Sequence, residues 1–230
     1  MKGIHPNFSI DIIEPRYPTE FIAKQNFEFY DILDNFGLLP FLSNFQCYYP
    51  ELVRVFYSNL QITTEWVIIT EVTNIRIKMD IDMFYRITKL GTQGVCFEGN
   101  MVDEWRDDYC SHNVKSMICR ENVIIRGRIL AGQMKVETCI LHYIICRCLL
   151  CQTTNLAQAS EEDIILMWAM LTGREVNWGH LVRYQMKKAL RDNAPLTYVN
   201  HITDILIQFN VPLEDEPFED INWSTIPIGV

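Results

Sequence analysis

The sequence lacks the motifs that identify the common enzyme classes. It has no glycine-rich phosphate loop, no H-E-x-x-H pair and no G-x-S-x-G elbow. The stretch "GTQGVCFEGN" (91–100) holds three glycines at the wrong spacing for a phosphate loop, and no Lys-Ser/Thr pair follows. None of the five histidines has a Ser, Cys or Asp relay partner at a recognisable spacing. We therefore expect no enzymatic activity and no bound cofactor.

A long apolar run is also missing. The most apolar stretch, Cys139 to Cys151, reads "CILHYIICRCLLC" and is interrupted by His142 and Arg147. It falls short of the roughly 20 residues that span a bilayer, so a buried core helix is expected. The first 18 residues lack the apolar core and small-residue cleavage site of a signal peptide. We expect an intracellular protein, cytoplasmic or nuclear, that is neither secreted nor membrane-bound.

Positive charge is scarce. Lys and Arg number 20 against 29 Asp and Glu, which gives a net charge of −9 and a pI near 5.0. A protein that binds a polyanion usually carries the opposite sign over at least one face. This balance disfavours nucleic acid as a partner without excluding a local basic patch. A protein partner stays open.

Residues that break helices are few, with 10 Gly and 9 Pro, whereas 49% of the chain is hydrophobic. This composition predicts a globular fold with a large core and excludes a mostly disordered chain. The apolar periodicity predicts a mainly α fold, a single globular multi-helix domain with a small β-hairpin. We expect an N-terminal arm (1–18), a helical domain (19–212) and an acidic C-terminal tail (213–230).

The stretch "ELVRVFYSNLQI" (51–62) follows a proline that suits the first turn of a helix. Leu52, Val55, Phe56 and Leu60 recur at spacings of three and four, which makes one apolar stripe. The stripe predicts a helix that faces the core, with Phe56 and Leu60 buried.

Two short strands, Trp66–Val72 and Asn74–Met79, are predicted to form a hairpin around Thr73 and Asn74. Asp80 is placed to cap a helix that continues to Leu90. Beyond a glycine-containing loop, a short helix is expected within residues 101–110. The segment 111–135 is ambiguous between strand and helix, and 136–150 is predicted to be helical.

The last third has clear helix signals. Ser160 and Asp163 form a near capping box that opens a helix, Glu161–Leu171, and Asn177 caps the next, Trp178–Leu190. A final helix is predicted to begin near Val199.

Eight cysteines lie in the chain, and half of them belong to the apolar run. Because the chain is large and carries no secretory signal, reduced and buried thiols are expected rather than disulfides. Cys139, His142 and Cys146 share a helical face, but Cys148 points away, and the neighbours are apolar. Zinc needs four converging ligands, so we expect core cysteines and no metal.

The acidic residues suggest no catalytic centre. Asp80 and Asp82 form a carboxylate pair, but helix capping accounts for Asp80, and a two-metal site needs several more carboxylates. A second group surrounds Trp105 and is expected to be a solvated helix face. Its members are Asp103, Glu104, Asp107 and Asp108.

One helix face collects basic side chains in this acidic chain: His180, Arg183, Lys187 and Arg191. Water, an external anion and the acidic tail that begins at Glu214 compete for this face. Water is the default partner of exposed charges. We hypothesise that the tail lies against the face and that its apolar end, Trp223 and Ile226, docks as well.

Several tracts resemble, in matching order, the plant family called putative plant transposon protein. "LVRVFYSNL" is similar to its L-V-x-E-F-Y-A-N-L tract, with "GLLPFL" before it. "CRCLLCQTTN", "DIILMWAMLTGREVNWGHLVRYQM" and "LTYVNHITDILIQFNVP" follow in the family's order over about residues 20–212. Cys151 stands where the family has Pro, and Val55 where an acidic residue is usual. The resemblance implies a plant chain of mobile-element origin, and it carries over no catalytic residues.

Two functions are compatible with these observations. The first is a non-catalytic domain of transposon or retrotransposon origin that acts as a protein-interaction or assembly module. The second is a degenerate nucleic-acid-processing or nucleic-acid-binding protein of a mobile element. The second predicts converging carboxylates in a cleft, and no acidic triad can be assembled from the expected loop ends, so the first is favoured.

Overall fold

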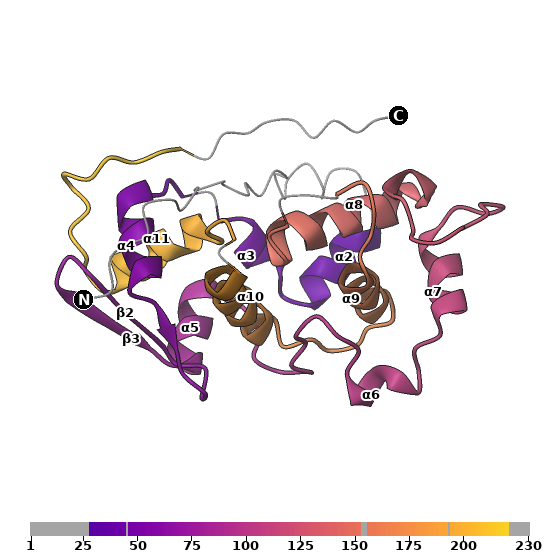
Figure 1. Cartoon of the computed structure of the whole chain (residues 1–230), viewed down its shortest axis with the longest axis horizontal. Coiled ribbons are helices and arrows are strands. Elements are labelled where there is room, and N and C mark those ends of the chain that lie inside the picture. The colour runs from indigo at the N-terminus through magenta and orange to yellow at the C-terminus, as the bar shows by residue number, and fades with distance from the viewer. Residues whose placement is uncertain (1–27, 45, 153–155, 193, 221–230) are drawn as a thin grey trace.

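The computed structural model describes residues 28–44, 46–152, 156–192 and 194–220. These residues form a mainly α-helical single domain with one small antiparallel sheet (Figure 1). The helices before residue 120 are α2 (Glu28–Asn35), α3 (Leu39–Leu42), α4 (Pro50–Ser58), α5 (Ile81–Thr88), α6 (Asp103–Arg106) and α7 (Ser111–Ile118). The later helices are α8 (Val136–Ile144), α9 (Glu161–Leu171), α10 (Trp178–Asp192) and α11 (Val199–Gln208). None of the described helices is both long enough and apolar enough to cross a membrane.

The sheet lies at one end of the molecule beside α4, α5 and α11 (Figure 1). Its strands are β1 (Gln61–Ile62), β2 (Ile68–Val72) and β3 (Ile75–Met79), in that order. The predicted hairpin is confirmed, and the short strand β1 adds an edge that the sequence did not suggest. Thr73 and Asn74 both have positive φ, +48° and +63°, as a two-residue turn of matching twist requires.

Helix α4 covers one face of the sheet. Phe56 is fully buried and Leu60 is 8% exposed, as predicted, whereas Val55 of the predicted stripe is 37% exposed. The Thr70 hydroxyl on β2 donates a hydrogen bond to the Phe56 carbonyl at 2.8 Å, and the Asn59 amide donates to the Glu71 carbonyl at 2.7 Å. These bonds attach the end of α4 to β2 and fix how the helix lies on the sheet.

The predicted helix caps are present. The Asp80 carboxylate accepts a hydrogen bond from the Met83 N–H at 2.8 Å, and the Asn177 side chain accepts one from the His180 N–H at 2.8 Å. Helix α5 ends at Thr88 rather than at Leu90, because Lys89 adopts a left-handed conformation and closes the helix first. Helix α10 extends two residues beyond the predicted Leu190.

The ambiguous segment 111–135 contains α7, a single 3-10 turn (Ala131–Gln133) and no strand. Residues 122–130, which the β-branched run made a candidate strand pair or helix start, form neither. They are held by single bridges, such as the one between Leu130 and Gln158. Residues 136–150 are helical as predicted, but the α-helix stops at Ile144 and a π-helical turn follows.

The acidic tail runs back to the start of α4. The Glu219 and Tyr48 backbones exchange hydrogen bonds of 3.0 and 2.9 Å, and the Tyr48 hydroxyl also donates to the Glu219 carboxylate. The Phe218 ring lies 6.3 Å from that of Tyr49. The described part of the tail thus pairs ahead of α4, whereas we had expected it on α10. Trp223 and Ile226 lie outside the described residues.

Candidate functional site

A strained turn after α8 organises the most polar part of the interior. The π-helix η2 (Ile145–Leu149) continues α8, and the Leu150 N–H reaches back five residues to the Ile145 carbonyl at 2.8 Å. Cys151 then adopts a left-handed conformation with φ +51°. Single π turns and left-handed non-glycine residues cost free energy and are frequent at functional sites. This turn, with its three thiols, is the starting point for a candidate site.

On one side of the turn lies a buried cluster of three donor side chains: His142 on α8, Cys146 on η2 and Asp163 on α9. The His142 Nε2 is 3.1 Å from the Cys146 Sγ and 3.4 Å from an Asp163 carboxylate oxygen. The donor atoms of all three lie within 4.8 Å of one another, and no residue is more than 2% exposed. Two segments about 20 residues apart in sequence are joined here.

Asp163 is the centre of this cluster. Its carboxylate accepts hydrogen bonds from the Ser160 N–H at 2.7 Å and from the Gln152 amide at 2.6 Å. The first of these bonds completes the predicted capping box of α9, which the structure confirms. Burial acts to raise the pKa of Asp163, but the hydrogen bonds from His142 and Ser160 outweigh it and leave the pKa below its usual value.

The thiol of this cluster, Cys146, is expected to be a poor nucleophile. Burial, together with the nearby Asp163 carboxylate, raises the pKa of Cys146 far above its usual value, and the residue is 1% exposed. A reactive cysteine needs a lowered pKa and access to substrate. In a catalytic relay the acid and the nucleophile also meet opposite ring nitrogens of the histidine, whereas both partners here meet Nε2.

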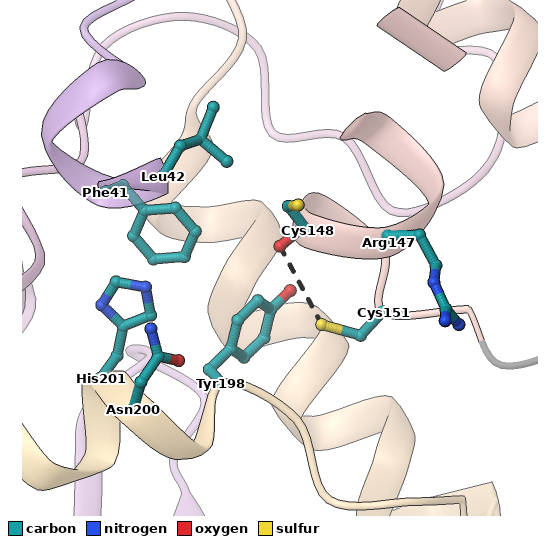
Figure 2. Close-up of a pocket in the computed structure, with 8 residues that line it drawn as sticks. All are labelled: Phe41, Leu42, Arg147, Cys148, Cys151, Tyr198, Asn200 and His201. Carbon is teal, nitrogen blue, oxygen red and sulfur yellow. Dashed lines mark hydrogen bonds between the residues drawn. The ribbon is translucent and has the colours of Figure 1, made fainter. Parts of the chain in front are cut away.

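On the other side of the turn lies a small aromatic pocket (Figure 2). The rings of Phe41 and His201 stack 3.9 Å apart and nearly parallel, and the Tyr198 hydroxyl donates to the Leu149 carbonyl at 2.6 Å. The cavity of about 20 Å³ has room for roughly one water molecule. Arg147 points away from the rings in Figure 2.

Burial favours the uncharged forms of the imidazole and the two thiols of this pocket. Burial lowers the pKa of His201 to about 3 and raises the pKa of Cys148 and of Cys151 to about 12. At neutral pH the imidazole is therefore uncharged and the two thiols are protonated. The pocket has the properties of a polar core and not of an acid–base centre.

A wider polar groove of about 350 Å³ opens beside the buried cluster. Gln152 and Ser160, which hydrogen-bond Asp163, line it, as does Cys151, which also lines the aromatic pocket. Across the groove the Glu162 carboxylate accepts hydrogen bonds from Gln185 at 2.9 Å and from Lys188 at 3.3 Å. The groove gives solvent a route to the residues that surround the cluster.

A second groove, of about 370 Å³, lies where α2 and α8 pack side by side (Figure 1). Its lining is mostly apolar, and Val136 stands at 64% exposure, unusually high for a large apolar residue. Among the described residues, Lys135 and Glu137 are the only charged ones that line it, and their charges cancel. The apolar lining residues are Phe29, Ile32, Met117, Val136, Leu141 and Leu171.

The predicted basic face of α10 is divided between interior and surface. His180 is 4% exposed and meets a Glu98 carboxylate oxygen at 2.9 Å, while Arg183 is 2% exposed with its guanidinium 5.3 Å from the Phe84 ring centre. Lys187 lies over the Trp66 ring, and Arg191 is paired with Asp192. Contact of these side chains with an anion, or with the tail beyond residue 220, stays a prediction.

Arg183 is the least expected of these residues. Among the described residues, its Nε and Nη1 atoms are buried without a hydrogen-bond partner. Burial lowers the pKa of its guanidinium. The sequence placed Arg183 on a solvated stripe because helical spacing cannot tell an exposed cation from one stacked on a core ring.

Three of the acidic residues flagged in the sequence have separate partners. Asp80 caps α5, Asp103 pairs with Arg106 at 2.7 Å, and Asp108 pairs with Arg174 at 2.7 Å. Sequence reasoning missed the cluster around Asp163, which it treated only as a helix cap. The one signal in the sequence that pointed to this cluster is a capping aspartate that follows an apolar run with His and Cys.

Comparison with known proteins identifies one family. A family model described as "Putative plant retrotransposon-related domain" matches residues 34–212, more than three quarters of the chain. No curated protein and no solved structure matches the chain.

Proposed function

The chain belongs to the putative plant retrotransposon-related domain family, and we propose that it acts as a non-catalytic interaction module of mobile-element origin. The family match confirms the resemblance seen in the order of the sequence tracts. The specific role is our inference from the surface and the interior of the domain. The observation that carries it is the apolar groove between α2 and α8.

The groove supports binding of an apolar segment. Its volume of about 370 Å³ lies in the range typical of ligand pockets, roughly 300–1,000 Å³. Amphipathic helices bind other proteins by placing large apolar side chains into such grooves. Because the lining has one Lys and one Glu, its charge matches an uncharged apolar surface and not a polyanion. The occupant we propose is an amphipathic helical segment of a partner protein.

The interior supports a non-catalytic role in a complementary way. Cys146 and Cys148 in the strained turn and His201 in the adjacent pocket are buried. Burial raises the pKa of both thiols and lowers the pKa of the imidazole, which favours their uncharged forms. The reduced thiols fit an intracellular site of action, cytoplasmic or nuclear.

A binding assay with defined peptides tests the proposal. The probe is a fluorescent helical peptide of about 15 residues, roughly four turns, with a leucine stripe. The reference peptide has the same composition with the stripe scrambled. We expect the striped peptide alone to bind the full chain, and Val136→Glu to weaken binding about tenfold or more, since a charge would be buried in the groove.

Ile124→Glu is the matched control, because Ile124 is 74% exposed and does not line the groove. Equal effects of the two substitutions, or equal binding of the two peptides, would rule out the groove. If deletion of residues 1–27 strengthens peptide binding, this first segment of the chain competes with the peptide for the groove. Salt-sensitive binding of a DNA or RNA oligonucleotide without peptide binding would favour the nucleic-acid alternative.

A further inference from the structure

We propose that His142, Cys146 and Asp163 form a buried site for a divalent transition metal, with zinc the best match to the donors. This site lies outside the groove on which the proposed function rests. The sequence led us to expect no metal because only donors within the run 139–151 could be considered. The structure adds Asp163 from α9, which no spacing rule would place beside His142.

The shared ring nitrogen is the first argument. Both Cys146 Sγ and Asp163 Oδ2 approach the same atom, His142 Nε2, at 3.1 and 3.4 Å. A ring nitrogen has either one hydrogen or one lone pair, so it cannot make two directional hydrogen bonds with full strength. Three donor atoms arranged around a common point are instead what a single metal ion requires.

The distances are close to those of a tetrahedral zinc site. Zinc bonds of about 2.0–2.2 Å to nitrogen and oxygen place these two donors roughly 3.4 Å apart, as His142 and Asp163 are. With a zinc–sulfur bond of about 2.3 Å, sulfur and nitrogen would stand roughly 3.6 Å apart. The Cys146 Sγ must therefore move outward by about half an ångström when the metal enters.

Charge is the second argument. Asp163 is fully buried, and its three hydrogen-bond partners are the neutral groups of Ser160 and Gln152 and the imidazole of His142. Removing a carboxylate from water is costly, and buried carboxylates are therefore usually paired or bound to a metal ion. A divalent metal with one carboxylate and one thiolate leaves the cluster neutral, because a coordinating thiol loses its proton.

A route and a fourth ligand are both at hand. Gln152 and Ser160 line the polar groove and also hydrogen-bond to Asp163, so these two residues connect the groove to the cluster. Either a groove water or the Gln152 amide oxygen, after rotation of the amide, can complete four ligands. The thiolate and imidazole donors favour zinc over calcium or magnesium, which prefer oxygen. The metal would fasten η2 to the start of α9.

The test is metal binding by the full chain purified with reductant and without a metal-affinity column. We expect about one zinc per chain by elemental analysis. Cobalt added to the chelator-treated protein should give the charge-transfer absorption of a thiolate ligand. Cys146→Ser should abolish that absorption and weaken zinc binding by roughly tenfold or more. Cys139→Ser, in the same run but outside the cluster, should leave both unchanged.

Asp163→Asn and His142→Gln extend the test should Cys146→Ser fail to fold. The N-cap of α9 is Ser160, which this change leaves in place, so Asp163→Asn keeps α9 while it removes the ligand charge. Loss of metal in these variants, with melting like that of the chelated parent, supports the site. Three results overturn it: no metal or cobalt absorption in the parent, absorption that survives Cys146→Ser, or equal loss in Cys139→Ser.

Discussion

Two regions of the domain differ in how far their structure follows from local sequence. In the sheet region, the hairpin of β2 and β3, the Asp80 cap and the stripe of α4 each follow from residues close in sequence. In the region of α8, η2 and α9, the arrangement depends on the contact between Asp163 and His142 and on a π turn. Local rules predict the first region and miss the second.

This difference shows where function can be sought. In the sheet region, the hydrogen bonds that cap α5 and attach α4 to β2 join residues that lie close in sequence. The region of α8, η2 and α9 contains a buried carboxylate, a π-helical turn and, directly after it, the left-handed Cys151. Proteins depart from local rules mostly at functional or strained sites, because such departures cost stability.

The largest expected effect concerns the sheet region. Phe56→Ala removes a fully buried ring and should lower the free energy of unfolding by about 3–5 kcal/mol. Val55→Ala, at a neighbouring residue that is 37% exposed, should cost less than about 1 kcal/mol. Chemical denaturation of both variants measures the two values. Similar small losses in both would show that α4 does not face the core.

One capping residue in each region allows the two regions to be compared directly. Asp80→Ala removes an exposed, purely local cap of α5 and should cost about 1 kcal/mol. Asp163→Ala removes a cap and also leaves the buried donors of Gln152 and His142 without their acceptor, so about 3 kcal/mol is expected. Unfolding of chelator-treated protein gives the difference without a metal contribution. Equal costs would mean that Asp163 is only a local cap.

Acid should destabilise the aromatic pocket through His201. Its pKa is about 3 in the folded protein and 6.5 in the unfolded chain, so only the unfolded chain takes up a proton between these values. The free energy of unfolding is therefore highest above about pH 6.5 and falls as the pH drops, by about 3 kcal/mol at pH 4.

His201→Gln is the comparison for this effect, and it should flatten the pH dependence. The neighbouring Asp204 carboxyl, whose pKa burial raises, acts in the opposite sense but is present in both proteins. Urea titrations of the two proteins between pH 4 and 7 measure the difference. Parallel curves would mean that His201 is accessible to protons.

The tail gives the smallest expected effect. Truncation after Pro212 removes the two backbone hydrogen bonds between Tyr48 and Glu219, and about 2 kcal/mol of stability should be lost. Truncation after Asp220 keeps this pairing, so the difference between the two truncations isolates its contribution to stability. If residues beyond 220 cover the basic side chains of α10, both truncations raise salt-sensitive affinity for nucleic acid. If neither truncation changes the affinity for nucleic acid or the melting temperature, Lys187 and Arg191 are exposed to solvent and not covered by the tail.

The sequence predicted the fold class, the hairpin and the caps at Asp80, Ser160 and Asn177 because each depends on a few adjacent residues. It misplaced the end of α5, where Lys89 closes the helix, and offered strand or helix for residues 122–130, which form neither. Arg183 was expected to be a surface cation, because helical periodicity alone does not show which residues pack against a side chain. The Asp163 cluster is a contact between segments, and one sequence does not encode such contacts in its spacing.

The central claim is that the chemically promising thiols of this domain are interior groups and not nucleophiles. Timed labelling of the native protein at neutral pH with a thiol reagent, followed by mass spectrometry of each cysteine, tests it directly. Cys110 and Cys96 are exposed and should be labelled first, whereas Cys146 and Cys148 should be labelled only as the protein unfolds. Labelling of Cys146 or Cys148 as fast as that of Cys110 would contradict the account and indicate an accessible, activated thiol.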